Sequence, residues 1–118
     1  MTRDKNAEKI AALNDALRKD PYSGRHGHIV MTRSVAALGS AFTSKALQIL
    51  AALTPESFEP GNDPYGERDF AVFEVEDQKL YAKIDAFEQG SGYLSAAENP
   101  ENAEKTERVL TLMLGEDY

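Results

Sequence analysis

The chain has 118 residues, a formal net charge of −7 and no cysteine, with 42% hydrophobic and 28% charged residues. This length suits one domain with an apolar core, and the lack of cysteine excludes disulfides and thiolate chemistry. The polar amino terminus lacks the apolar segment of a secretory signal, and no apolar run is long enough to span a membrane. We therefore expect a single cytoplasmic domain over residues 1–118.

The charge is divided unevenly along the chain. Residues 1–45 hold eight basic and four acidic residues, a balance of +4, whereas residues 46–118 hold five basic and sixteen acidic residues, a balance of −11. The simplest interpretation is that charge keeps a small domain soluble. The asymmetry also allows a basic end that binds nucleic acid, or an acidic surface that repels nucleic acid and attracts basic partners.

Two helices and a strand are predicted in the first half. Apolar residues recur with helical spacing over residues 7–18, and Pro21 ends that helix because the residue before proline avoids helical backbone. β-Branched and apolar residues over 28–33 predict a strand. Helical spacing returns over residues 41–53, which predicts the second helix.

The centre of the chain predicts a β-hairpin. Residues 56–68 are rich in Pro, Gly, Asn and Asp, the residues that turns require, so we expect a long loop there. Two apolar runs follow over 70–75 and 80–87, separated by a polar break at 76–78. Alternate residues share a face in each strand, so one face should pack on helices while the other is at least partly wet.

The carboxyl-terminal segment fits two structures. Residues 89–98 predict a polar loop, and Asn99-Pro100-Glu101 is typical of a helix start with proline in the first turn. Apolar residues from 103 to 114 fit a helix, but Val109–Leu114 is also an apolar run that could form a buried strand. The cap and the length favour the helix.

These elements predict an α+β fold in the order α-β-α-β-β-α, with a small antiparallel sheet built on the central β-hairpin and about three helices packed on it. The expected core collects the apolar residues at the inward positions. It comprises Ile10, Leu13, Leu17, Val30, Phe42, Leu47, Ile49, Leu50, Phe73, Leu80, Ile84, Leu110 and Met113.

Two histidines raise the possibility of a metal site. His26 and His28 have the spacing at which two imidazoles project from one face of a strand. Carboxylates such as Asp63, Glu67 and Asp69 could complete the ligand set. Two histidines without a third histidine or a cysteine are more often surface residues, so a small metal-dependent enzyme is the less favoured alternative. No nucleophile motif accompanies these carboxylates, and we assign no catalytic residue, cofactor or metal.

The basic first third supports another alternative, a regulator that binds nucleic acid. It would act through Arg3, Lys5, Arg18, Arg25 and Arg33. Acidic residues interleave with these cations, whereas a phosphate-binding stripe rarely alternates in sign this closely. Direct nucleic-acid binding is therefore the second interpretation rather than the first.

Five stretches cover almost the whole chain in order: IAALNDALRK (Ile10–Lys19), IVMTRSVAALG (Ile29–Gly39), NDPYGERDFAVFEV (Asn62–Val75), KLYAKIDAF (Lys79–Phe87) and RVLTLMLGEDY (Arg108–Tyr118). Together they resemble the domain of unknown function 3768 family of bacteria. The resemblance implies no activity, cofactor or catalytic residue. It implies a genomic context, because family members look like accessory genes of plasmids, integrative elements and prophages.

The acidic balance, the lack of a complete catalytic motif and this resemblance predict a non-enzymatic protein of a mobile genetic element. We expect it to occupy a basic surface on a host defence complex, such as a restriction or CRISPR effector, and to block nucleic-acid access as a DNA mimic. The expected contacts are carboxylates of the central loop and hairpin and, as a second set, of the predicted last helix. They are Asp63, Glu67, Asp69, Glu74, Glu76 and Asp77, with Glu101, Glu104 and Glu107 in the second set.

Overall fold

The structure is a computed structural model that describes residues 2–58, 61 and 63–117, and side chains from Asn6 onward within these ranges. The described residues form three α-helices and four strands, which confirms the predicted α+β class. The helices are α1 (Thr2–Lys19), α2 (Arg33–Ala36) and α3 (Ser40–Ala52). The strands are β1 (His28–Met31), β2 (Phe70–Val75), β3 (Gln78–Glu88) and β4 (Thr106–Leu114). Short 3-10 turns are η1 (Pro55–Ser57), η2 (Ala103–Lys105) and η3 (Gly115–Asp117).

The four strands form one sheet in the order β1-β4-β3-β2. β2, β3 and β4 are antiparallel neighbours, whereas β1 runs parallel to β4 at the edge of the sheet. The prediction of a purely antiparallel sheet is therefore wrong at this edge. Alternation along β1 predicts a strand, but it does not encode which distant strand becomes the neighbour or in which direction that strand runs.

The carboxyl-terminal segment forms β4, so the predicted last helix is wrong. β4 pairs with β1 along one edge and with β3 along the other, which places Leu112 between Met31 and Ala82. VLTLML forms a strand here because its alternate leucines, Leu110, Leu112 and Leu114, are buried in the core on the covered face of the sheet. The residues before β4 form a loop and η2, where the Asn102 side chain accepts a hydrogen bond from the Glu104 N–H at 3.0 Å. The element order is α-β-α-α-β-β-β, and the third helix is the short α2.

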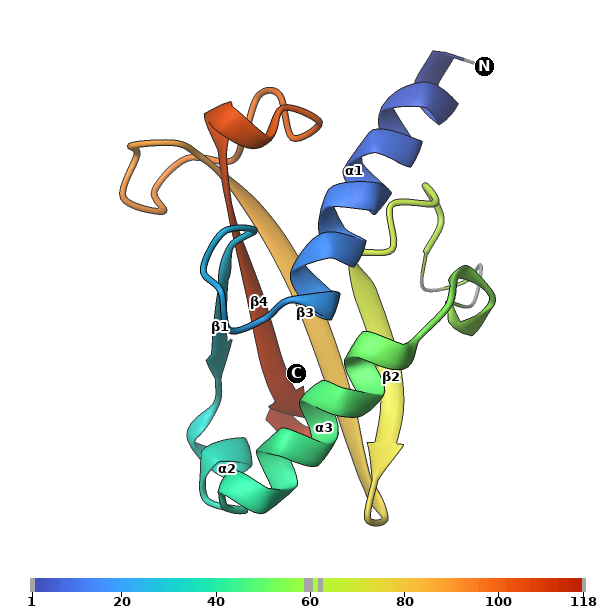
Figure 1. The fold of residues 1–118 in the computed structure, drawn as a ribbon, viewed down its shortest axis with the longest axis vertical. Coiled ribbons are helices and arrows are strands. Elements are labelled where there is room, and N and C mark those ends of the chain that lie inside the picture. Colours follow the sequence, from blue (N-terminus) through green and yellow to red (C-terminus); the bar gives the residue numbers. More distant parts are fainter. Residues whose placement is uncertain (1, 59–60, 62, 118) are drawn as a thin grey trace.

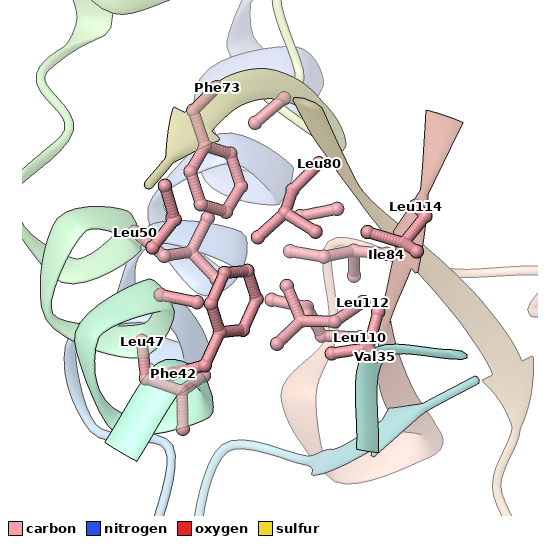
Figure 2. Packing of buried hydrophobic residues seen from close by; sticks show 14 of the residues in the cluster. Val35, Phe42, Leu47, Leu50, Phe73, Leu80, Ile84, Leu110, Leu112 and Leu114 are labelled. Atoms are coloured by element: carbon pink, nitrogen blue, oxygen red, sulfur yellow. The ribbon is translucent and has the colours of Figure 1, made fainter. Parts of the chain in front are cut away.

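The helices lie on one face of the sheet (Figure 1). α3 presents an apolar face to the sheet, and α2 adds Val35, which is completely buried. Figure 2 shows the core that results, in which side chains of α2 and α3 meet the inward side chains of β2, β3 and β4. The labelled members are Val35, Phe42, Leu47, Leu50, Phe73, Leu80, Ile84, Leu110, Leu112 and Leu114.

Most of the predicted core residues are buried, with three exceptions. Leu13 and Ile49 are half-buried, and Val30 is 46% exposed. Val30 lies on the outward side of β1 because its neighbours Ile29 and Met31 pack against the core, and successive side chains of a strand point to opposite faces.

The predicted hairpin is confirmed. β2 spans the predicted residues, and β3 begins at Gln78, directly after a two-residue turn. Glu76 and Asp77 form that turn with φ angles of 49° and 68°. Two-residue turns with positive φ at both positions favour asparagine and glycine, because other side chains crowd the backbone there. The hairpin therefore ends in two carboxylates held in a costly backbone conformation.

Candidate binding surfaces

The second face of the sheet carries none of the described helices (Figure 1). We call it the uncovered face and define it by the outward positions of the four strands. They are His28 and Val30 on β1, Glu107, Val109, Thr111 and Met113 on β4, Lys79, Tyr81, Lys83, Asp85 and Phe87 on β3, and Phe70, Val72 and Glu74 on β2. This confirms the prediction that one face of the hairpin packs on helices and the other is partly wet.

Aromatic and aliphatic side chains occupy much of the uncovered face. The Phe70 and Tyr81 rings lie 5.4 Å apart, and on the other side of the face Tyr93 packs edge-on against Phe87 at 5.6 Å. Val30 and Val72 are 46% and 37% exposed. A shallow hollow of about 510 Å³ lies beside Tyr93 and Phe87. Apolar side chains gathered on an exposed surface are typical of the centre of a protein interface.

The fold divides the nine predicted contact carboxylates among three places. One group lies at the hairpin end of the sheet, one in the loop that precedes β2, and one around the start of β4. These are Glu74, Glu76 and Asp77; Asp63, Glu67 and Asp69; and Glu101, Glu104 and Glu107. Glu88 pairs with Thr106 and Leu80 with Leu114, so the first and last groups lie at opposite ends of the β3–β4 pair. Glu101, Glu104 and Glu107 do not lie along one helix, as the sequence predicted, because the residues before β4 form a loop and η2.

Several of these carboxylates have local roles. Glu76 accepts a hydrogen bond from Lys45 at 2.6 Å, and Asp63 accepts one from the Arg68 backbone N–H at 2.9 Å. Asp69 is half-buried, and burial raises its pKa, assisted by the negative charges of Asp63 and Asp85. The predicted contacts that share the uncovered face are Glu74 and Glu107.

A groove of about 300 Å³ beside α1 brings together carboxylates that are far apart in the sequence. Glu67 from the loop before β2 and Glu101 from the loop before β4 line it together with Glu98. Sequence reasoning missed Glu98, because no periodic pattern relates it to the other two. Its position in a loop that returns towards α1 is a property of the whole fold.

The two histidines lie on a cleft of about 210 Å³ at the amino-terminal end of β1. His26 Nε2 is 3.4 Å from the Asp20 carboxylate, and Glu107 also lines the cleft. The carboxylates of the 63–69 loop, which the sequence offered as further ligands, do not line it. Within the described part of the chain, no group of three or more histidine or carboxylate side chains is arranged to hold a metal ion.

A family model described as a protein of unknown function (DUF3768) matches residues 31–117. The chain belongs to this family. The match spans β2, β3 and β4, and therefore most of the uncovered face, and it begins after α1 and the two histidines. No curated protein and no solved structure shows significant similarity to the chain.

Membership of the DUF3768 family confirms the predicted family and by itself assigns no activity. None of the described helices is long and apolar enough to cross a membrane.

Exposure corrects the alternative nucleic-acid-binding set. Arg18 is 2% exposed and forms an ion pair with Asp15, so it cannot reach an external phosphate. Arg25 and Arg33 are exposed and lie on either side of β1. The side chains of Arg3 and Lys5, which the sequence also proposed, lie outside the described part of the structure.

A polar network holds α1 in place. Asp15 accepts hydrogen bonds from Arg68 Nε and Nη2 at 3.0 and 2.7 Å and is also paired with Arg18. Burial alone would raise the pKa of Asp15, but the Arg68 hydrogen bonds and the charges of both arginines outweigh it, so this pKa lies below its ordinary value. The Arg18 guanidinium also lies 4.8 Å from the centre of the Phe58 ring. This network serves the fold, because Asp15 pairs with both arginines within it, although Arg18 Nε is buried without a hydrogen-bond partner among the described residues.

A second buried contact links α1 to β4. Arg108 is 3% exposed, and its Nε donates to Asn14 Oδ1 at 2.8 Å. Asn14 in turn donates to the backbone oxygen of Glu67 at 2.9 Å. Burial lowers the pKa of Arg108, and the Glu67 charge partly opposes that shift. Charged and amide side chains thus fix α1 to strand β4 and to the loop before β2, which no local pattern predicted.

Proposed function

We propose that this member of the DUF3768 family is a non-enzymatic binding protein that docks its uncovered face on a positively charged surface of a protein partner. One observation carries the proposal: apolar and aromatic side chains occupy much of this face, and carboxylates flank it at both ends of the strands. Glu74 lies near the hairpin end and Glu107 near the opposite end. An apolar centre with a charged rim is the usual anatomy of a protein interface.

The charge of the uncovered face favours a protein over nucleic acid as the partner. Its two lysines are offset by three carboxylates, on Glu74, Asp85 and Glu107. Lys83 Nζ also lies 3.5 Å from Asp85, so part of its charge is compensated within the face. A surface that tracks a phosphate backbone needs an excess of cations, and this face has none.

The partner we expect is a complex that handles nucleic acid, such as a restriction or CRISPR effector. Such complexes carry basic surfaces that hold phosphates. Carboxylates at both ends of the uncovered face, with Asp77 and Glu104 further out at each end, would oppose such a surface over the length of the sheet. Occupation of that surface would exclude nucleic acid, and charge steering would make association fast and sensitive to salt.

The proposal is tested by capture from bacterial lysate with matched variants. Glu74→Lys with Glu107→Lys reverses two charges of the uncovered face. Glu8→Lys with Glu56→Lys makes the same change of net charge at exposed positions on α1 and η1. We expect the wild type and the second variant to retain a nucleic-acid-handling protein, the first variant to lose it, and duplex DNA to displace it.

Three results would contradict the proposal. One is tight binding of duplex or single-stranded DNA by the purified protein at low salt, which would favour the regulator. Another is an equal loss of capture in both double variants. The third is a dimer, detected by sedimentation, that dissociates when Val72 is changed to aspartate, since the uncovered face would then bind a second copy.

A further inference from the structure

The cleft at the amino-terminal end of β1 is rich in hydrogen-bond donors. Its wall is the loop of residues 24–28, and the start of β4, Leu13 of α1, Ala103 of η2 and Gln89 just after β3 complete it. Arg25, His26, His28, Gln89 and Arg108 line it, and Glu107 supplies the only carboxylate among the described lining residues. Two arginines and one glutamate therefore line the cleft, and Asp20 lies beside it, 3.6 Å from Arg25 and 3.4 Å from His26 Nε2. The cleft thus differs from residues 46–118, where carboxylates are in large excess.

Gly27 holds the loop against β4. Its φ angle is 144°, and a Cβ atom at this position would lie 2.5 Å from the Arg108 backbone oxygen and 3.1 Å from Leu17 Cδ2. Only glycine allows that approach. Arg25 and the two histidines of this loop are therefore held beside the start of β4 by a backbone contact that other residues would prevent.

Arg108 is a buried cation that forms no direct ion pair with a carboxylate of the described residues, although the charge of Glu67 acts on it. Its two hydrogen bonds go to neutral oxygens, Asn14 Oδ1 and the Pro100 carbonyl, and no carboxylate of the described residues lies within ion-pair distance of it. Arg18 is equally buried but is paired with Asp15. Removing a cation from water without a counter-ion is costly. The Arg108 hydrogen bonds also leave one terminal nitrogen that donates to no described residue.

We propose that this cleft binds the phosphate group of a small ligand, with Arg108 at its base and Arg25 and His26 at its rim. Arginine presents a planar fork of donors that matches a phosphate, and the ion would place a counter-charge in direct contact with Arg108. Arg25 is 80% exposed, and its 3.6 Å separation from Asp20 is too long for a hydrogen bond, so its donors can turn to a ligand. The cleft holds about 210 Å³, which suits a small ligand. The cleft shares His28 and Glu107 with the uncovered face, but phosphate binding does not require the docking proposed for that face.

The test is a titration of the full chain, labelled with ¹⁵N, with sodium phosphate, uridine monophosphate or sodium chloride at matched ionic strength. We expect saturable shifts of the residue 24–28 and 106–108 amide signals with the two phosphates and not with chloride. Arg25→Ala with His26→Ala should weaken binding at least about tenfold, since each charge-assisted hydrogen bond contributes about that factor or more. Glu107→Gln should strengthen binding by removing the opposing charge.

Arg33→Ala is the matched control, because it removes an exposed arginine beyond the other end of β1. It should leave phosphate binding unchanged. Tighter binding of the monophosphate than of inorganic phosphate would assign the cleft to a nucleotide, and equal binding would assign it to the free anion. The proposal is overturned if chloride produces the same shifts, or if Arg33→Ala weakens binding as much as the loop double variant. Because Arg108 is left intact in every variant, folding does not limit the test.

Discussion

The two faces of this sheet are built from alternate residues of the same strands, yet helices cover the side chains of one face and not those of the other. Phe73 faces the helices and is 8% exposed, whereas its neighbour Val72 lies on the uncovered face and is 37% exposed. The covered face is closed by α1, α2 and α3, so its apolar side chains stabilise the fold. The uncovered face keeps apolar side chains without a cover from any described helix, which is the reason for assigning it to binding.

The same difference holds for charged side chains. On the covered side, Asp15 joins Arg18 and Arg68 at positions about one-fifth exposed or less. On the uncovered face, Lys83 and Asp85 lie 3.5 Å apart with side chains 47% and 40% exposed. Removing the partner of a buried charge lowers the free energy of unfolding strongly, whereas an exposed ion pair contributes little to it. Charges of the uncovered face can therefore vary with function at small cost to the fold.

The largest expected effect separates adjacent residues of β2. Phe73→Ala should lower the free energy of unfolding by about 3–5 kcal/mol, because it removes a buried ring and leaves a cavity. Val72→Ala, one residue away on the uncovered face, should cost less than about 1 kcal/mol. Urea unfolding followed by circular dichroism measures both. Equal losses in the two variants would show that the two faces are not distinct in packing.

A somewhat smaller difference is expected between two aspartates. Asp15→Asn should destabilise the protein by about 2–4 kcal/mol, since it leaves Arg18 buried without a counter-charge. Asp85→Asn should change stability by about 0–1 kcal/mol. Both variants keep the side-chain size, so the comparison isolates the charge. If Asp15→Asn unfolds at the wild-type urea midpoint, the network does not fix α1 as described.

The pH dependence of stability should carry the signature of Asp15. Its folded pKa is lowered, so its contribution is present above its unfolded pKa of about 3.9 and is lost as the pH falls through the lower folded pKa. The stability difference between wild type and Asp15→Asn should therefore shrink as the pH is lowered from 6 to about 2. The pKa of Asp117 is also lowered, by the Thr32 hydrogen bond first, but Asp117 titrates in both proteins and cancels in the difference. A constant difference over this range would contradict the role given to Asp15.

The hairpin and α3 could be predicted from the sequence because their signals are local. Alternation with a polar break defines β2 and β3, and helical spacing defines α3. β4 was predicted wrongly as a helix, since the spacing of VLTLML suits a buried strand as well as a helix, and the cap before it favoured the helix. The strand is decided by its neighbours β1 and β3. Arg18 and Arg108 look like surface cations in the sequence, and their burial depends on Asp15 and Asn14, which only the packing of α1 brings to them.

The site was predicted less completely than the fold for the same physical reason. The sequence identified an excess of carboxylates and named Glu74 and Glu107, both of which lie on the uncovered face. It could not show that these two lie towards opposite ends of one face, or that Arg108 meets the loop of His26 at a cleft. Such neighbours come from strand register and from the close approach of Gly27, and neither leaves a periodic signal.

The smallest effect concerns the turn that joins the hairpin strands. Glu76→Asn with Asp77→Gly would place the preferred residues at two positive-φ positions and should raise the free energy of unfolding by about 1 kcal/mol. The exposed Lys45–Glu76 pair is lost in this variant, but such pairs contribute little. Under the proposed function the same variant should associate more slowly with the basic partner, because two carboxylates at one end of the uncovered face are removed.

Glu76→Gln alone is the control, since it keeps the turn backbone and removes one charge. Higher stability together with slower association would show that the two acids are kept in a strained turn for binding, whereas higher stability with unchanged association would exclude the hairpin end from the interface.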